Sequence, residues 1–469
     1  MAENTEVREL WRDALTGKIS RRDVMRRGLA LGLSAPVLAA LAQETVRGTL
    51  AATEGTLSVT YYQWIVQNHP TLERDFNPEF TKTLEAQGMK LNAEVAPVEG
   101  FGFERFLAEA QKQDSTWDFY LGVTPFLEMI QLADSGTIEP WDEYLPAGLL
   151  DDLPTSIKDE GTYKDKFYVW PFLLDVIVQG WNAEQVAKAG LDPEVAPKNW
   201  DEFIANATKV KESGAARFGA TFDRHPWRSL IPITHSIKTD VYDPTTGIFL
   251  WNSDEAVQAL EIMKRIFEVA NPDLVNPGNT DGGVNDTPDE RAFAAQGACY
   301  YVKYQNAHLR FGGTWPDPSQ IRISALPVQE GGAGGTVFWD TGAVLFTYGK
   351  NKPQAAEYVN ALTHNDLFWQ RSISGNPAEG EVAPVQLWTY KSLWEGYRTS
   401  NPEWLQNSQW VFSIYDGLDK AKAIAPSKLA FSQFTIGLPF YLAYLQGEES
   451  DPKAALTKAY DAVMAEYNK

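Results

Sequence analysis

The chain is poor in the side chains that build covalent cross-links and metal sites. It has one cysteine, Cys299, among 469 residues, so it can form no intrachain disulfide. Its five histidines lie far apart and lack the short, regular spacing of metal ligands. We therefore expect neither a metal nor any other cofactor. A chain of this length can bury a core large enough to be stable without them.

Signatures of catalysis are missing as well. The sequence has no G-x-S-x-G, H-E-x-x-H, Walker-type or G-x-G-x-x-G pattern. We therefore predict no catalytic residues and a protein that is not an enzyme. A secreted carbohydrate-active enzyme stays open as an alternative, because glycoside hydrolysis needs only two well-placed carboxylates.

Basic residues are scarce relative to acidic ones. The sequence has 41 Lys and Arg against 62 Asp and Glu, a net charge of −21. Nucleic acids and anionic membrane surfaces bind proteins through basic patches, so we expect neither as a partner. After the N-terminal segment, no apolar run approaches the ~20 residues that span a bilayer. The sequence thus predicts an acidic, soluble mature protein.

The N-terminal segment 1–42 has the features of an export signal. Arg21 and Arg22 form a twin-arginine pair in a basic run, which is followed by an apolar stretch, 28–41, and the small-residue pattern A-L-A. This order is typical of a secretory signal, and the paired arginines favour the twin-arginine route. A retained membrane anchor is the alternative, although the stretch is short for a bilayer span. We expect an extracytoplasmic protein with 43–469 as its mature chain.

The rest of the sequence alternates strand-like runs with capped amphipathic helices, which is typical of an α/β fold. Strands are expected at 57–62, 118–121 and 298–302. Helices are expected to begin at four capping signals, Asn199, Ser253, Thr287 and Asp451. The glycine-rich segment 331–335 is expected to be a flexible connector.

Four blocks of sequence, in order, resemble those of the extracellular solute-binding proteins that serve ABC importers. They are T-W-D-F at 116–119, S-G-T-I-E-P-W at 135–141, Y-K-D-K-F-Y-V-W-P at 163–171, and A-G-L-D with P-K-N-W-D-E between 189 and 202. Trp117 stands where the family usually has proline, and Asp165 where it has glycine. The similarity runs from about Leu57 to the C-terminus and is strongest to the sugar-binding branch that includes maltose-binding proteins.

The resemblance implies a fold and a function. The fold is two α/β lobes, built from discontinuous stretches and joined by hinge crossovers: 56–173 with 338–400, and 174–337 with 401–469. A ligand, here a mono- or oligosaccharide, would be trapped between the lobes by hinge closure and delivered to the permease subunits of an ABC transporter. Nothing in the sequence suggests a large apolar self-interface, so we expect a monomer.

Sugars present apolar C–H faces and a rim of hydroxyls, which aromatic rings and carboxylates or amides bind. The resemblance places ligand contacts at Gln63, Trp64, Thr124, Trp170, Asp175, His225, Trp227, Tyr304, Trp339 and Asp340. Structural roles remain open for several of them: loop packing for Gln63 and Trp64, and a buried ion pair for Asp175, which interrupts an apolar run. Asp118 is expected to cap a backbone group instead.

The chemistry of the ligand stays open at this point. Gly122, Pro125 and Phe126 stand where maltose-binding proteins have a tryptophan and an Asp–Arg pair, so we do not expect maltose. A polyol is one alternative to a sugar. A polyamine is another, because tryptophans together with Asp175 and Asp340 would also suit a cationic ligand.

Overall fold

The computed structural model describes residues 55–96, 103–275, 287–329, 331–332 and 334–469. The expected signal segment 1–42 lies outside the described residues. Within them, the fold is α/β as predicted, and no helix is long and apolar enough to cross a membrane.

The strands, in chain order, are β1 (Thr56–Tyr61), β2 (Lys90–Val95), β3 (Phe119–Val123), β4 (Ile138–Glu139), β5 (Thr162–Tyr163), β6 (Lys166–Phe167), β7 (Trp170–Asn182), β8 (Phe218–Phe222), β9 (Ala298–Tyr304), β10 (Ile321–Ala325), β11 (Val337–Phe346) and β12 (Lys422–Ala423).

The α-helices are α4 (Gln63–Asn68), α5 (Asn77–Ala86), α6 (Glu104–Gln111), α7 (Pro125–Asp134), α8 (Leu149–Asp152), α9 (Thr155–Glu160), α10 (Ala183–Lys188), α11 (Trp200–Glu212), α12 (Leu230–Ile237), α13 (Asp254–Val269), α14 (Pro288–Ala294), α15 (Gln305–Gly312), α16 (Lys352–Thr363), α17 (Asp366–Ser374), α18 (Lys391–Ser400), α19 (Val411–Tyr415), α20 (Ser432–Gln446) and α21 (Pro452–Tyr467).

The predicted capping signals begin helices. Asn199 Oδ1 accepts a hydrogen bond from the Glu202 N–H at 2.8 Å at the start of α11, and Ser253 Oγ accepts one from the Ala256 N–H at 3.1 Å at the start of α13. Thr287 opens α14 with a capping box, and Asp451 caps α21. These bonds satisfy N–H groups that have no partner inside the helix, so a few residues suffice to fix where each helix starts.

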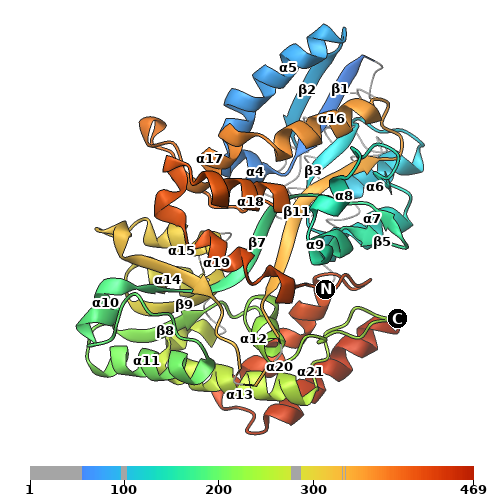
Figure 1. Ribbon diagram of the computed structural model, residues 1–469. Coiled ribbons are helices and arrows are strands. Elements are labelled where there is room, and N and C mark those ends of the chain that lie inside the picture. The colour runs from blue at the N-terminus through green and yellow to red at the C-terminus, as the bar shows by residue number, and fades with distance from the viewer. Residues whose placement is uncertain (1–54, 97–102, 276–286, 330, 333) are drawn as a thin grey trace, which may run out of the picture.

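One mixed sheet connects the whole molecule. Its strand order is β2-β1-β3-β11-β7-β9-β8. β1 lies parallel to β2 and β3, β8 lies parallel to β9, and the pairs from β3 to β9 are antiparallel. β7 and β11 therefore pass between the two ends of the molecule, and they occupy the middle of Figure 1.

β7 changes its hydrogen-bonded neighbours near its midpoint. Its first half, from Trp170 to Val176, pairs with β11, whereas its second half, from Ile177 onwards, pairs with β9 and β10. All thirteen residues of the strand are buried. The strand thus belongs to two packing environments, and Asp175 lies next to the point where one gives way to the other.

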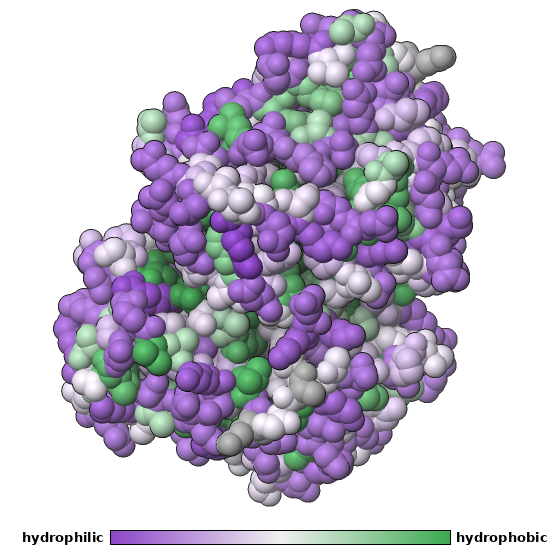
Figure 2. Space-filling view, in the orientation of Figure 1, coloured by the Kyte–Doolittle hydropathy of each residue, from purple (hydrophilic) through white to green (hydrophobic). Residues whose placement is uncertain are grey.

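Two hydrophobic cores lie on either side of this point. We call first core the cluster around β1, β3, the first half of β7 and α16–α19, and second core the cluster around β8, β9, α11–α13, α20 and α21. Leu405, Val411 and Leu418 pack in the first core, although the expected lobe boundary assigned 401–469 to the other lobe. Figure 2 shows a mostly hydrophilic face, with hydrophobic side chains visible between the upper and lower parts.

Asp118 caps backbone groups, as predicted. Its carboxylate accepts hydrogen bonds from the backbone N–H groups of Ser58 at 2.8 Å, Lys350 at 2.7 Å and Asn351 at 2.9 Å. It thereby ties β1 to the turn before α16. Asp118 is fully buried, and the Asn351 side-chain amide also donates to it at 3.2 Å, so its carboxylate has a structural role in the fold.

Candidate ligand-binding cavity

A cavity of about 300 Å³ opens beside the point where β7 changes neighbours. Side chains from both cores line it, carried by the ends of β1, β3 and β9, by the starts of α4, α7 and α15, and by β7 and β11. The lining residues are Tyr62, Trp64, Gly122, Thr124, Phe126, Leu127, Asp175, His225, Trp227, Arg228, Tyr304, Asn306, Arg310, Trp339, Thr341 and Phe431. Segments far apart in sequence meet here because β3, β11 and β7 are neighbours in the sheet.

The structure brings most of the expected ligand contacts together at this cavity. The expected residues that line it are Trp64, Thr124, Asp175, His225, Trp227, Tyr304 and Trp339. They come from β7, from β11 and from four different strand or loop ends. No local sequence pattern predicts that these residues meet at one cavity, because they lie on segments far apart in the chain.

Three expected contacts do not line the cavity. Trp170 is fully buried in the first core, where its indole N–H donates to the Tyr390 hydroxyl at 2.6 Å. Asp340 is fully buried beside Glu160, whose carboxylate accepts a hydrogen bond from the Asp340 backbone N–H at 3.1 Å. Gln63 begins α4, next to the lining residues Tyr62 and Trp64 but not among them.

Aromatic rings form one wall of the cavity. Trp227 and Trp339 meet edge to face with their ring centroids 5.0 Å apart, and Tyr304 meets Trp339 the same way at 5.9 Å. Phe126, at the start of α7, packs against Trp227 within the second core, with the ring centroids 5.7 Å apart. Such rings supply large apolar area at fixed geometry, which suits the C–H face of a small ligand.

Asp175 supplies a buried carboxylate to the cavity. Its Oδ1 accepts hydrogen bonds from the side-chain amides of Gln305 at 2.9 Å, Asn306 at 2.6 Å and Gln386 at 3.0 Å. Its Oδ2 is approached only by the Gln386 amide, at 3.2 Å, among the described residues. Burial raises the pKa of Asp175 to about 6, although these hydrogen bonds oppose the shift. Oδ2 is thus the oxygen that can accept a ligand hydroxyl.

A buried ion cluster lies behind the aromatic wall. Asp223 is fully buried and pairs with Lys303, with Arg228 at 2.9 Å and with His225 Nδ1 at 2.6 Å. Burial alone would raise the pKa of Asp223, but the charges of Lys303, His225 and Arg228 outweigh that effect and hold it well below its usual value. Lys303 also pairs with Asp289 at 2.8 Å, which links α14 to β9. The cluster fixes the segment that carries His225 and Trp227.

The expected ligand contacts did not include two arginines that line the cavity, Arg228 and Arg310. The Arg228 guanidinium lies 4.0 Å from the Trp227 ring centroid and 5.0 Å from that of Tyr304. Arg310 donates a hydrogen bond to the Tyr304 hydroxyl at 3.1 Å. Arg228 directly follows a residue singled out for stacking, and Arg310 stands one helical turn after Asn306, so the spacing along α15 was the signal that could have revealed it.

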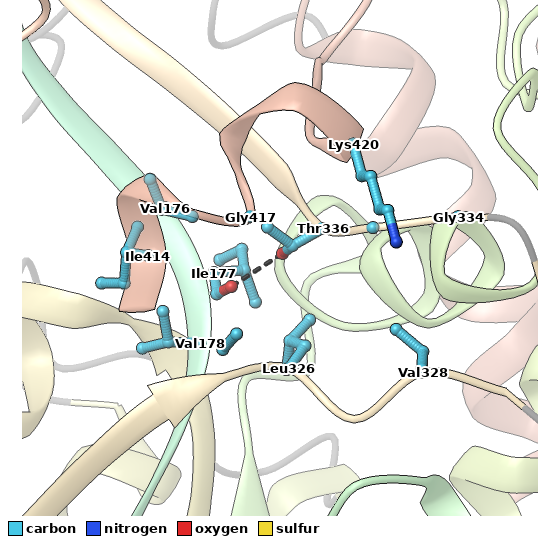
Figure 3. A pocket seen from close by; sticks show the side chains of 12 residues that line it. Val176, Ile177, Val178, Leu326, Val328, Gly334, Thr336, Ile414, Gly417 and Lys420 are labelled. Atoms are coloured by element: carbon cyan, nitrogen blue, oxygen red, sulfur yellow. Dashed lines mark hydrogen bonds between the residues drawn. The ribbon is translucent and has the colours of Figure 1, made fainter. Parts of the chain in front are cut away.

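A second cavity, of about 100 Å³, lies on another side of the β7 midpoint (Figure 3). Val176, Ile177, Val178, Leu326 and Ile414 give it aliphatic walls. The Thr336 hydroxyl donates a hydrogen bond to the Ile177 carbonyl at 2.7 Å, and Lys420 is the one charged side chain among the described residues that line it. It lacks the aromatic and hydrogen-bonding groups that orient a polar ligand, so the first cavity is the candidate site.

No group of three or more His, Cys, Asp or Glu side chains among the described residues is placed to hold a metal ion. Cys299 is buried, and burial raises the pKa of its thiol to about 12. Such a thiol is inert at neutral pH.

The fold and the cavity define a class of protein: an α/β binding protein with two cores joined by crossing strands and a ligand-sized cavity between them. A family model described as bacterial extracellular solute-binding protein matches residues 69–366. This chain belongs to that family. The family consists of binding proteins rather than enzymes and acts outside the cytoplasm.

Solved structures share the fold over most of the chain. The cyclic α-maltosyl-1,6-maltose binding protein of Arthrobacter globiformis is 17% identical and has a TM-score of 0.65, over 88% of this chain and 99% of that one. An ABC substrate-binding protein of Listeria monocytogenes in complex with cycloalternan is 15% identical with a TM-score of 0.66, over 87% and 97%. An ABC transporter solute-binding protein of Agrobacterium radiobacter in complex with ribitol is 16% identical with a TM-score of 0.63, over 88% and 100%. At these identities the likeness shows the fold alone.

Proposed function

We propose that this protein captures a carbohydrate or a polyol in the cavity beside the β7 midpoint and delivers it to an ABC permease. The observation that carries the proposal is the composition of the cavity wall: three aromatic rings, Trp227, Trp339 and Tyr304, face a region that also holds the Asp175 carboxylate. Rings bind the C–H face of a sugar and the carboxylate binds its hydroxyls. The structural neighbours that bind a cyclic maltosyl-maltose, cycloalternan and ribitol support the same class of ligand.

A polyamine is disfavoured by the charges at the cavity. Arg228 and Arg310 line the same wall as the aromatic rings, and both guanidiniums would repel an ammonium group. The cation–π contacts that a polyamine would use are already made by Arg228, whose guanidinium lies over Trp227 and Tyr304. Asp340, expected as a partner of a cationic ligand, is buried beside Glu160 instead.

We further propose that the two cores are two lobes that close over the ligand, that segment 1–42 is a twin-arginine export signal, and that the protein acts as a monomer. The paired cores and the crossing strands β7 and β11 support hinged lobes.

The basic run with Arg21 and Arg22 supports the export route. Fusing residues 1–42 to a reporter that is active only when exported folded, with an Arg21→Lys and Arg22→Lys control, tests that route.

A thermal-shift screen of neutral sugars, polyols, acidic sugars and polyamines tests the ligand class. A ligand present at about 100 times its dissociation constant adds roughly 2.7 kcal/mol of stability, which gives a clear rise in melting temperature. We expect sugars or polyols to raise it and spermidine not to. A rise with spermidine alone, or with none of these compounds, would overturn the proposal.

A further inference from the structure

Arg228 and Arg310 present positive charge to the cavity, while the acids that balance them face away from it. The side chains of Arg228 and Arg310 are 22% and 20% exposed and line the cavity. Asp223 and Glu290, their partners, are 1% and 2% exposed and do not line it. The ion cluster is therefore layered, with carboxylates inside the protein and guanidiniums on the ligand side.

The pairing of these guanidiniums is incomplete. Among the described residues, Arg310 makes one hydrogen bond, to the Tyr304 hydroxyl, and its ion pair with Glu290 is long, at 3.8 Å. The Nε atoms of Arg228 and Arg310 are both buried and have no hydrogen-bond partner. A buried N–H without a partner is unfavourable, and a guanidinium has five donors in a fork that fits a carboxylate. The terminal nitrogens of the two guanidiniums, on side chains that are partly exposed and line the cavity, are the donors within reach of an acidic ligand.

Asp175 adds a hydrogen-bond acceptor to the cavity. Its Oδ1 is held by the Asn306 amide at 2.6 Å, and its Oδ2 is the acceptor in the same lining as the two guanidiniums. This set matches a molecule with one anionic group and several hydroxyls. Asp175 would bind the hydroxyl end, because a carboxylate placed next to it would be repelled.

We propose that the ligand is an acidic carbohydrate whose carboxylate is bound by Arg310 and Arg228 while its hydroxyls reach Asp175. This inference rests on the proposed function and narrows it from carbohydrates in general to uronate-type sugars.

The test compares matched sugars that differ only in the acidic group. Isothermal titration calorimetry at pH 7.5 measures D-galacturonate against D-galactose, D-glucuronate against D-glucose, and digalacturonate against the α-1,4-linked galactose disaccharide. We expect at least one acid to bind ten times or more tighter than its neutral partner. Arg310→Gln should reduce that preference at least tenfold. Arg322→Gln, at a half-buried arginine on β10 that pairs with Glu194 and does not line the cavity, should leave it unchanged.

The outcomes separate this inference from the proposed function. Neutral sugars that bind as tightly as their acids, or an unchanged preference in folded Arg310→Gln, would overturn the acidic-sugar inference and leave carbohydrate binding standing. Binding of neutral sugars or polyols in the thermal-shift screen, with no acid bound at millimolar concentration, would do the same. No binding by any sugar or polyol would overturn both. A circular dichroism melt of each variant checks that it is folded.

Discussion

Asp175 divides its two oxygens between the protein and the cavity. Three amides donate to Oδ1, and this bonding fixes the plane of the carboxylate before any ligand arrives. An oxygen held in this way needs little reorganisation to accept a hydroxyl, so its bond to a ligand costs little conformational entropy.

Asp175→Asn should weaken ligand binding by about tenfold or more without unfolding the protein. The asparagine oxygen would take the position of Oδ1 among the three amides, and its NH2 group would replace Oδ2, turning an acceptor into a donor. Calorimetry with the best ligand of the screen measures the loss. Wild-type affinity in this variant would remove Asp175 from the site.

The same variant has an expected pH signature. The raised pKa of Asp175 means that the folded state holds its proton more tightly than the unfolded state, so stability is lost as pH rises through about 6. Asp175→Asn removes that loss, and its melting temperature at pH 7.5 should equal or exceed that of the wild type. A lower melting temperature at pH 7.5, with no change at pH 5, would contradict this reading of the carboxylate.

Trp227→Ala should weaken ligand binding by about tenfold or more and cost about 3 kcal/mol of stability. Trp227 is 8% exposed and packs on Trp339 and Phe126, so it belongs to both the cavity and the core. Trp404→Ala, in a half-buried tryptophan of a 3₁₀ helix at Glu403–Ser408, is the matched control. It should lower stability and leave affinity unchanged, as measured by thermal melts and calorimetry.

Residue type and local position place several of the expected residues at the cavity. Trp64 and Trp227 are large side chains in segments that follow strand ends, and such ends meet at a sheet edge, whereas Asp175 is a carboxylate inside the apolar strand β7. Trp170 and Asp340 have the same chemical character but point into the first core and toward Glu160. The direction of a side chain on a two-sided buried strand depends on register, which no single segment of sequence contains.

At the scale of elements, the end of β3 forms part of the cavity wall because glycine stands there. Gly122 has φ +152°, and a Cβ atom at this position would lie 2.4 Å from the Tyr62 Cβ. The close approach of β3 to the start of α4 brings Tyr62 and Thr124 to the same wall. A residue with a side chain would push these elements apart.

Gly122→Ala should lower stability by about 2 kcal/mol or more and reduce ligand affinity, since it combines a strained backbone conformation with clashes against the side chains of Tyr62 and Tyr120. Gly396→Ala is the control: Gly396 lies inside α18, and a Cβ there meets no atom within 4 Å. The control should be neutral or stabilising by up to about 1 kcal/mol. Chemical denaturation of both variants measures the difference. Equal effects would show that the wall tolerates a side chain.

The contact between α9 and β11 contains two buried carboxyl groups. Glu160 and Asp340 are 2% and 0% exposed, and their two side chains contact each other. Burial raises the pKa of Asp340 to about 8 and that of Glu160 well above its usual range. The pair therefore holds at least one proton at neutral pH.

This pair should make the wild type lose stability as the medium becomes alkaline. Because the folded pKa lies above the unfolded value, the stabilising contribution is complete below about pH 4 and disappears as pH rises through about 8. Asp340→Asn keeps the shape without the second ionisation, so its melting temperature should fall less between pH 6 and 9. Parallel pH curves for the two proteins would show that the pair does not titrate in this range.

Elements with local signals were predictable, and those that depend on distant partners were not. The starts of α11, α13, α14 and α21 follow from caps within four residues of sequence. The length of β7, by contrast, cannot be read from its apolar run alone, because its second half becomes a strand only by pairing with β9 and β10. The strand order of the sheet depends on the same distant contacts.

At the scale of the whole molecule, ligand binding should bring the two cores together. A ligand favours closure only by the contacts it makes in the closed form and lacks in the open form. The cavity draws its wall from both cores: Tyr62 and Trp64 pack against the first core, and Trp227 and Trp339 belong to the second. A ligand that touches both sides therefore gains contacts on closure.

Small-angle scattering should show a smaller radius of gyration for the saturated wild type than for the free protein, and no concentration dependence of mass at micromolar concentration. Asp175→Asn should show less closure at equal ligand concentration. An unchanged radius at saturation would contradict hinged closure, and a doubled mass would contradict a monomer.

The change of neighbours along β7 has a mechanical consequence. The hydrogen-bonded ladder to β11 ends at Val176, and the ladders to β9 and β10 begin at Ile177 and Val178. No single ladder therefore spans the junction between Val176 and Ile177. Asp175 lies one residue before the last residue of the β11 ladder, Val176. If Asp175 binds the ligand as proposed, the group that contacts the ligand and the backbone at the change of ladders are parts of one strand, and binding would alter the shape of the protein without a relay of intervening side chains. A pair of fluorophores, one on each side of this junction, would make the protein a direct optical reporter of its own ligand.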